Sequence, residues 1–206
     1  YPKLLATLPS KESGVRYRLE GYLFPATYGY GKDSKMEDLV DQMLAAMDQN
    51  LSAYYDTMEA KNIDVNEALT LASLIEKEGA TDKDRKDIAS VFYNRLNQDM
   101  PLQSNIAILY AQGQLGKKTT LKEDATIDTN IDSPYNIYKN TGLMPGPVDS
   151  PGLSAIEAAV NPSKTDYLYF VANVETGEVY FAKTYEEHTK NVEEHVNSKL
   201  TESSSN

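Results

Sequence analysis

One glutamate, Glu76, lies at an unusual position in a helix predicted over residues 64–79. At about 100° per residue, Glu76 falls inside the arc of apolar side chains instead of on the polar side of the helix. It also belongs to the last turn, where the negative end of the helix dipole disfavours another anion. Partial burial disfavours the anion as well. A carboxyl group held in this way suits a proton donor in general acid catalysis.

Two interpretations of Glu76 follow from this pattern. In the first, its carboxyl group is a catalytic acid. In the second, Glu76 lies at the rim of the core in a structural ion pair with an arginine such as Arg85 or Arg95, because such ion pairs also occur at these positions. The neighbouring Glu78 falls at the edge of the apolar arc, so the pattern singles out Glu76 alone.

The same stretch contains signals for its own start and end. Asp64 can cap the first turn, and Glu67 three residues later completes a capping-box pattern. Gly79 is expected to end the helix in the left-handed conformation. Thr70 and Ser73 fall on the polar side, opposite the apolar arc. The helix is therefore predicted to be amphipathic, with one buried face.

Several other segments show helical or strand patterns. Apolar residues recur at helical spacing over residues 35–61, 82–97, 104–110, 153–160 and 184–196. Aromatic and β-branched residues predict strands at 167–172 and 178–182, joined by a hairpin turn at 175–177. Residues 113–152 are rich in Pro and Gly, which is typical of a long functional loop. The prediction is a mostly helical α+β domain with a β-hairpin near the C-terminus.

Composition places the 206-residue chain among ordinary globular proteins, with 40% hydrophobic and 25% charged residues. The net charge of −11 argues against a nucleic-acid partner and against docking on an anionic membrane surface. There is no cysteine and no apolar stretch of about 20 residues that could span a membrane. The chain begins at Tyr1 and not at a methionine, so we interpret it as a domain excised from a longer protein.

The remaining chemistry is that of carboxylates beside tyrosines and amides. His188 and His195 lie seven residues apart without further ligands, which favours structural or surface roles over a metal site. No serine nucleophile elbow and no Gly-rich phosphate loop is present. The 15 tyrosines offer flat apolar faces with hydroxyl groups, which suit sugar rings. Polar side chains in or beside the turn-rich segments are candidates to face a groove: Gln103, Asn105, Tyr110, Tyr135 and Asn136.

Seven short blocks carry a resemblance to a known family. They are residues 19–25 (LEGYLFP), 72–78 (ASLIEKE), 89–96 (ASVFYNRL), 100–104 (MPLQS), 133–138 (SPYNIY), 141–147 (TGLMPGP), and 161–162 (NP) followed by 167–171 (YLYFV). Each block is short, but together and in this order they resemble the YceG-like (MltG) family of endolytic murein transglycosylases. The resemblance covers about residues 19–192.

This resemblance implies a lysozyme-like catalytic domain that acts on peptidoglycan glycan strands and needs no cofactor. Glu76 matches the single catalytic acid/base of the family. It would protonate the oxygen of the β-1,4 bond between N-acetylmuramic acid and N-acetylglucosamine, and then accept a proton from the C6 hydroxyl that attacks C1. The product would be a 1,6-anhydro end. Residues at family positions that would hold the glycan are Glu20, Gln103, Asn105, Tyr110, Tyr135 and Asn136.

Asn105 departs from the family pattern, because relatives often carry Asp there. A hydrogen bond made by that side chain could survive the change, but an effect of its charge could not. Two rival functions stay open. A lysozyme-like hydrolase would need a second carboxylate within roughly 5–10 Å of Glu76, from Glu20 or Asp132. A glycan-binding or scaffolding module would bind strands and be unaffected by Glu76→Gln.

The resemblance also predicts a division of the chain. Residues 1–18 would be a connection from a missing LysM-like part, residues 19–200 the catalytic domain, and residues 201–206 a frayed tail. Family members are anchored by one transmembrane helix, with the catalytic part outside the cytoplasmic membrane. We therefore expect an extracytoplasmic location, an anchor outside this chain, and cell-wall synthesis proteins as partners.

Overall fold

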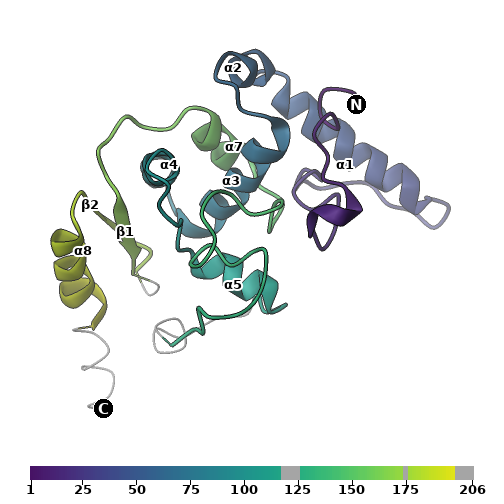
Figure 1. Cartoon of the computed structure of the whole chain (residues 1–206). Helices are drawn as coiled ribbons and strands as arrows, with labels where there is room; N and C mark the ends of the chain where they lie inside the picture. Colours follow the sequence, from purple (N-terminus) through teal and green to yellow (C-terminus); the bar gives the residue numbers. More distant parts are fainter. Residues whose placement is uncertain (117–125, 174–175, 198–206) are drawn as a thin grey trace.

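The computed structural model describes residues 1–116, 126–173 and 176–197 (Figure 1). The helical elements are η1 (Lys11–Ser13), α1 (Met36–Leu51), α2 (Tyr55–Ala60), α3 (Val65–Glu78), α4 (Asp82–Leu96), α5 (Asn105–Ala111), α7 (Leu153–Val160), α8 (Tyr185–Val192) and a π-helical turn (Glu193–Asn197). Strands β1 (Tyr169–Ala172) and β2 (Val179–Ala182) pair antiparallel. The predicted mostly helical α+β class with a C-terminal hairpin is confirmed.

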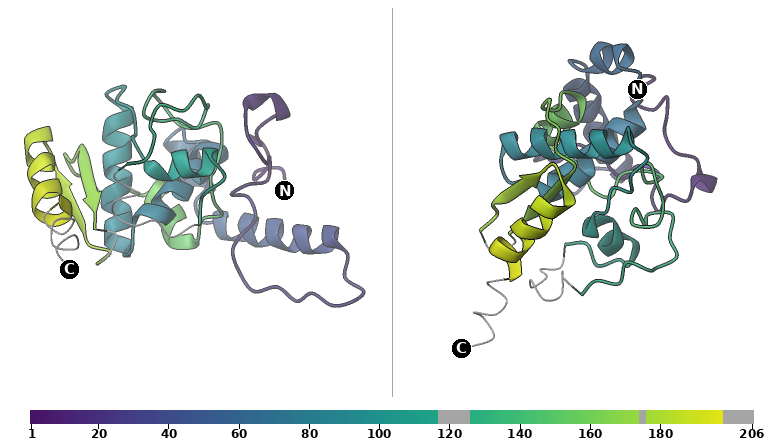
Figure 2. Two further views of the ribbon diagram at one scale, coloured as in Figure 1. Left: turned by 90° about the horizontal axis from the view of Figure 1, so that it is seen from below. Right: turned by 60° about the vertical axis from the view of Figure 1, so that its left-hand side comes forward.

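Helix α3 is the centre of the molecule. It packs against α4, α5 and α7, and α4 in turn contacts β1 (Figure 1). The left view of Figure 2 shows α8, the hairpin and α4 in succession, with α1 at the opposite end of the molecule. Because α8 packs on both strands of the hairpin, the hairpin and α8 form one unit. This unit meets the other helices (α1–α5 and α7, the helical body) at α4.

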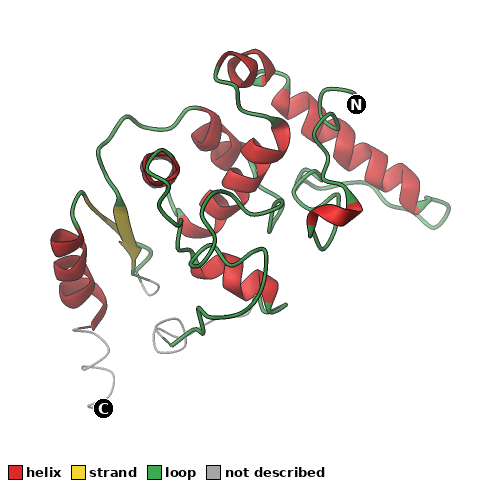
Figure 3. Ribbon diagram, viewed as in Figure 1, coloured by secondary structure: helices red, strands yellow, loops and turns green. Residues whose placement is uncertain are grey.

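The central position of α3 buries almost every side of it. All residues from Ala68 to Ile75 are buried, including Thr70 and Ser73, which have no exposed surface. The amphipathic prediction was therefore wrong about the polar side. The loop that leads into α7, drawn green before α7 in Figure 3, contacts this side at residue 148, where the Val148 amide donates a 3.0 Å hydrogen bond to Ser73 Oγ. Ser73 is polar because it anchors that loop.

This anchor gives a stability prediction. Ser73→Ala leaves the buried Val148 amide without its acceptor, which costs about 1–3 kcal/mol. Urea unfolding of the variant and the parent measures the difference. Ser13→Ala is the matched control, because Ser13 is exposed and donates only to the Ser10 carbonyl. A loss of unfolding free energy no larger than that of the control would contradict the anchoring role.

Two predicted elements differ from the structure. The helix expected over 35–61 is two helices, because the chain turns after Leu51 and the Ser52 hydroxyl donates to the Gln49 carbonyl. Gly79 ends α3 in an extended conformation, at φ −106°, and not in the left-handed one. A Cβ atom at Gly79 would lie 2.7 Å from Arg85 Cγ, so this glycine lets α4 approach the end of α3.

The helix starts follow the sequence closely. The capping box predicted at Asp64 is present, and a capping box at Thr184 and the Ser104 cap of α5 start two further helices close to the predicted positions. Residues 1–18 pack on the rest of the chain through Leu4, which is fully buried, and the domain boundary after residue 18 stays a prediction. The predicted tail at 201–206 and part of the hairpin turn lie outside the described residues.

No helix among the residues that the structure describes is long and apolar enough to cross a membrane.

Candidate active site

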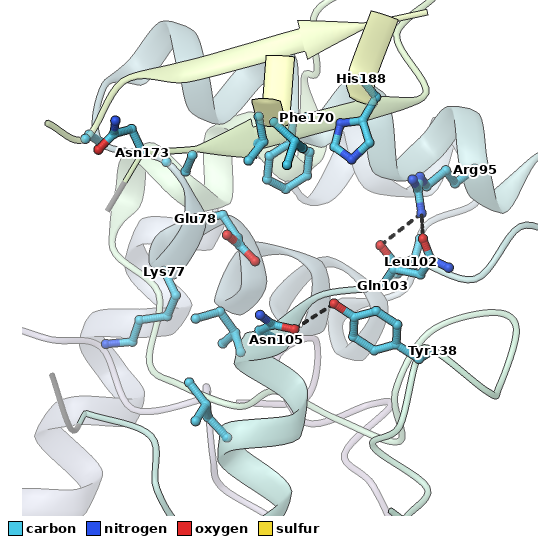
Figure 4. A pocket seen from close by; sticks show the side chains of 18 of the residues that line it. Lys77, Glu78, Arg95, Leu102, Gln103, Asn105, Tyr138, Phe170, Asn173 and His188 are labelled. Carbon is cyan, nitrogen blue, oxygen red and sulfur yellow. Dashed lines mark hydrogen bonds between the residues drawn. The ribbon is translucent and has the colours of Figure 1, made fainter. Parts of the chain in front are cut away.

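A cavity of about 860 Å³ separates the helical body from the hairpin–α8 unit (Figure 4). Its polar lining comes from both sides. Glu78 projects from the end of α3, Asn105 from the start of α5, and His188 from α8. Further lining residues include Lys77, Arg95, Gln103, Tyr138, Phe170 and Asn173.

Glu78 is the carboxylate of this cavity. Among the described lining residues no other carboxylate occurs. The Ser104 hydroxyl donates a 2.7 Å hydrogen bond to Glu78 Oε1, and the same hydroxyl accepts the Ile106 amide at the start of α5. Since Ser104 is only 2% exposed, this bond fixes the orientation of the Glu78 carboxyl group.

Glu76 lies outside that lining and is held by two other groups. The Gly152 amide, at the start of α7, donates to Glu76 Oε2 at 3.0 Å. The Arg85 guanidinium reaches Glu76 Oε1 at 3.4 Å. The ion pair of the second interpretation is thus present, with Arg85 as the arginine. Arg95 instead binds the carbonyls of Leu168 and Pro101, so it is not the partner of Glu76.

A smaller hollow adjoins the cavity and shares Lys77 with it. Glu20 and Tyr110 line this hollow, where the Tyr110 hydroxyl donates to Glu20 Oε2 at 3.3 Å. Burial raises the pKa of the Glu20 carboxyl, and the hydrogen bond from Tyr110 opposes that rise. The ring of Tyr135 packs on that of Tyr110, with centroids 4.9 Å apart, and is itself buried.

The two predicted asparagines have different surroundings. Asn105 lines the cavity, and its Oδ1 accepts a 2.6 Å hydrogen bond from the Tyr138 hydroxyl. Asn136 is fully buried; its amide group donates to the carbonyls of Thr129 and Ile131. Asn136 therefore holds the shape of the loop between α5 and α7, whereas Asn105 faces the open space.

The model of the YceG-like family matches residues 3–194. The chain belongs to the YceG-like family. It is 68% identical over 200 residues to the endolytic murein transglycosylase of Streptococcus pneumoniae serotype 2 strain D39, covering 97% of this chain and 36% of that protein. It is 47% identical over 186 residues to the endolytic murein transglycosylase of Bacillus subtilis strain 168, covering 90% of this chain and 50% of that protein.

A solved structure also belongs to the YceG-like family and has a similar fold. The crystal structure of a YceG-like protein from Listeria monocytogenes, at 2.6 Å resolution, superposes with a TM-score of 0.79. The two chains are 48% identical, and the match covers 92% of this chain and 58% of the other. This YceG-like chain spans between about a third and a half of the curated relatives described above.

Sequence reasoning passed over Glu78 and His188 in this YceG-like site. Glu78 follows Leu74 by four residues and Leu71 by seven, so it continues a row of buried positions on α3. Glu76 follows Ala72 and Leu69, which are also buried, at the same spacings, so this row gave no signal that separates the two glutamates. His188 had none either: it stacks on Tyr169, with centroids 5.3 Å apart at 23°, and lines the cavity only because α8 folds back over the hairpin.

The described residues contain no group of three or more His, Asp or Glu side chains that could hold a metal ion.

The environment of His188 predicts a pH effect on stability. Burial lowers its pKa, and the nearby Arg95 guanidinium lowers it further. The unfolded chain therefore takes up a proton below about pH 6.5 more readily than the folded chain, so stability is lost as the pH falls through that value. We expect the melting temperature to fall less between pH 7.5 and 5.5 in His188→Gln than in the parent. Equal decreases in both proteins would contradict this.

Proposed function

We propose that this chain is the catalytic part of a lytic transglycosylase that cuts inside peptidoglycan glycan strands. Its relatives in Streptococcus pneumoniae and Bacillus subtilis are endolytic murein transglycosylases, which supports the reaction class. The cavity supports it independently, because it is an open space lined by one carboxylate, several amides and aromatic side chains. This composition suits uncharged sugar rings that carry N-acetyl groups.

Glu78 is the general acid and base of the proposed reaction. The observation that carries this assignment is the position of its carboxyl group inside the cavity, oriented by Ser104. Glu76, the residue expected from the sequence pattern, has each carboxyl oxygen engaged by the protein, one by Arg85 and one by Gly152. A group that must exchange protons with a substrate needs access to it, and Glu78 lines the cavity whereas Glu76 does not.

The chemistry needs only this one carboxyl group. Protonated Glu78 donates its proton to the oxygen of the β-1,4 bond between N-acetylmuramic acid and N-acetylglucosamine, and the C1–O bond breaks. The C6 hydroxyl of the muramic acid then attacks C1, and Glu78 accepts its proton. The C1–O6 bond closes a 1,6-anhydro ring, and the carboxyl group returns to its starting state.

The absence of a second carboxylate from the described cavity lining disfavours a hydrolase. Enzymes that activate water use a pair of carboxyl groups across the scissile bond. Glu20, one candidate for that role, lies in the adjoining hollow and is bonded to Tyr110. Asp132, the other candidate, is exposed and is not among the residues that line the cavity.

The other residues proposed to contact the substrate lie in two places, the cavity and the adjoining hollow. Gln103 and Asn105 would bind the sugars nearest Glu78, and Glu20 and Tyr110 those further along the strand. The Tyr138 hydroxyl would donate equally to Asn or Asp at position 105, so this hydrogen bond survives the departure from the family pattern. Tyr135 and Asn136 would act by supporting these residues.

Digestion of purified peptidoglycan by this chain tests the proposal. The sugar termini are identified by mass spectrometry, and the lengths of the released strands by chromatography. We expect 1,6-anhydro ends and strands of intermediate length, as internal cuts produce. Reducing ends would show a hydrolase, and bound but uncut strands would show a glycan-binding module.

The proposed reaction also has consequences for the cellular location and the partners of the protein. Its substrate lies outside the cytoplasmic membrane, so we propose an extracytoplasmic location, with any membrane anchor outside this chain. Cell-wall synthesis proteins, which produce the nascent glycan strands, are the proposed partners.

A further inference from the structure

Gln103 combines three features that no structural role requires together. Its backbone lies in the left-handed region, at φ 59°, which residues other than glycine rarely adopt. Its side chain is nevertheless exposed and lines the cavity (Figure 4). Strained backbone positions persist where the surroundings hold them, and they are frequent at ligand sites.

The surroundings of Gln103 hold it from both sides. The Gln103 amide donates to the Ile137 carbonyl at 3.0 Å. The neighbouring Leu102 and Ser104 are both 2% exposed, and Ser104 binds Glu78. The backbone of Gln103 is thus fixed within the same segment that orients the proposed catalytic carboxyl group.

Arg95 determines which end of the Gln103 side chain faces the cavity. Its guanidinium contacts the Gln103 side chain at 3.2 Å (Figure 4). An arginine has only donors, so the atom that it contacts must be the carbonyl oxygen Oε1. The Gln103 NH₂ group then points away from Arg95 and makes no hydrogen bond within the described part of the chain.

Arg95 cannot easily turn to reverse this arrangement. Its side chain is only 6% exposed, and it also donates to the carbonyls of Leu168 at 2.6 Å and Pro101 at 2.7 Å. The guanidinium additionally lies over the Tyr169 ring, 5.0 Å from its centroid. A donor fixed by so many contacts orients its partner instead of following it.

We propose that Arg95 is a positioning residue that fixes Gln103 as a hydrogen-bond donor to the acetamido carbonyl oxygen of an N-acetyl sugar bound beside Glu78. This inference rests on the proposed function and adds the group that is recognised. A carbonyl oxygen is the strongest uncharged acceptor on such a glycan. The acetamido group distinguishes these sugars from glucose polymers of the same linkage.

Calorimetric titration with chitohexaose and cellohexaose at pH 7 tests the proposal, because the two uncharged β-1,4 oligomers differ in the acetamido group. Two variants separate the roles of Gln103. Gln103→Glu keeps an acceptor for Arg95 but has no NH₂ donor, and Gln103→Met has neither. The preference is the ratio of the Kd for cellohexaose to the Kd for chitohexaose. We expect this ratio to fall about tenfold in both variants, as the loss of one hydrogen bond would cause. We expect the melting temperature of Gln103→Glu to stay at or above that of the parent.

A structural role for Gln103 predicts another result. If the residue serves only to satisfy Arg95, Gln103→Glu keeps the full preference for chitohexaose, and that result would overturn the inference alone. A parent protein that binds neither oligomer would overturn the glycan-binding function together with the inference.

The role of Arg95 is tested by a double-mutant cycle. Arg95→Lys should reduce the preference for chitohexaose in the parent but not further in Gln103→Glu, since Arg95→Lys removes the guanidinium that orients the Gln103 NH₂ donor and Gln103→Glu removes the donor itself. Additive losses would show that Arg95 does not act through Gln103. If Arg95→Lys does not fold, the comparison of the two Gln103 variants decides alone.

Discussion

Glu78→Gln is expected to reduce strand cleavage by roughly 10³-fold, within the range that a general acid and base contributes. The amide has the same shape and can still accept the Ser104 hydrogen bond, so the fold should be retained. Release of soluble fragments from purified peptidoglycan measures the loss, and the melting temperature checks the fold. Activity within tenfold of the parent would exclude Glu78 as the proton donor.

Glu76→Gln is the matched control, because it makes the same change two residues earlier on the same helix. Its pairing with Arg85 spans 3.4 Å and is partly exposed, so its loss should cost no more than about 1 kcal/mol. We expect cleavage to stay within a few-fold of the parent. The reverse outcome, an inactive Glu76→Gln beside an active Glu78→Gln, would restore Glu76 as the catalytic acid.

Arg95→Met is expected to give the largest loss of stability, about 3 kcal/mol or more. The variant leaves the carbonyls of Leu168, Pro101 and Leu102 without their donor at the junction of the helical body and the hairpin. Urea unfolding measures the change. Cleavage should fall with it, because the hairpin forms one wall of the cavity.

Arg18→Met is the control for this change. Arg18 is exposed and donates from Nε to the Pro9 carbonyl, so we expect a loss of less than about 1 kcal/mol. If Arg95→Met is no less stable than Arg18→Met, the hairpin is held by other contacts, and Arg95 does not join the two parts.

Most of the secondary structure could be predicted because its signals are local. The capping boxes at Asp64 and Thr184 depend on side chains three residues apart, and both are present. The burial of α3 depends on a distant loop, so a pattern within 14 residues could not show that Thr70 and Ser73 are covered. The amphipathic interpretation failed for that reason.

Contacts from distant parts of the chain also decide which residues form the candidate site. Glu76 stood out because α3 was taken to have one buried side, whereas the distinction between Glu76 and Glu78 depends on α7, α4 and α5. Gly152 and Arg85 approach Glu76, and Ser104 approaches Glu78. No spacing within α3 contains this information. Gln103 and Asn105 were predicted to lie close together, since their segment follows a proline-induced turn between two helices, and both line the cavity. Their contacts with a glycan stay a prediction.

Digestion in water enriched in ¹⁸O tests most directly the central claim that one carboxyl group, without an activated water, cuts the strand. The newly formed muramic acid termini are analysed by mass spectrometry. The proposed reaction closes the ring with the sugar's own C6 oxygen, so these termini should contain no ¹⁸O and have the mass of the anhydro form. One ¹⁸O atom for each cut would show that water attacks C1, and would contradict the assignment of Glu78 as the sole acid and base.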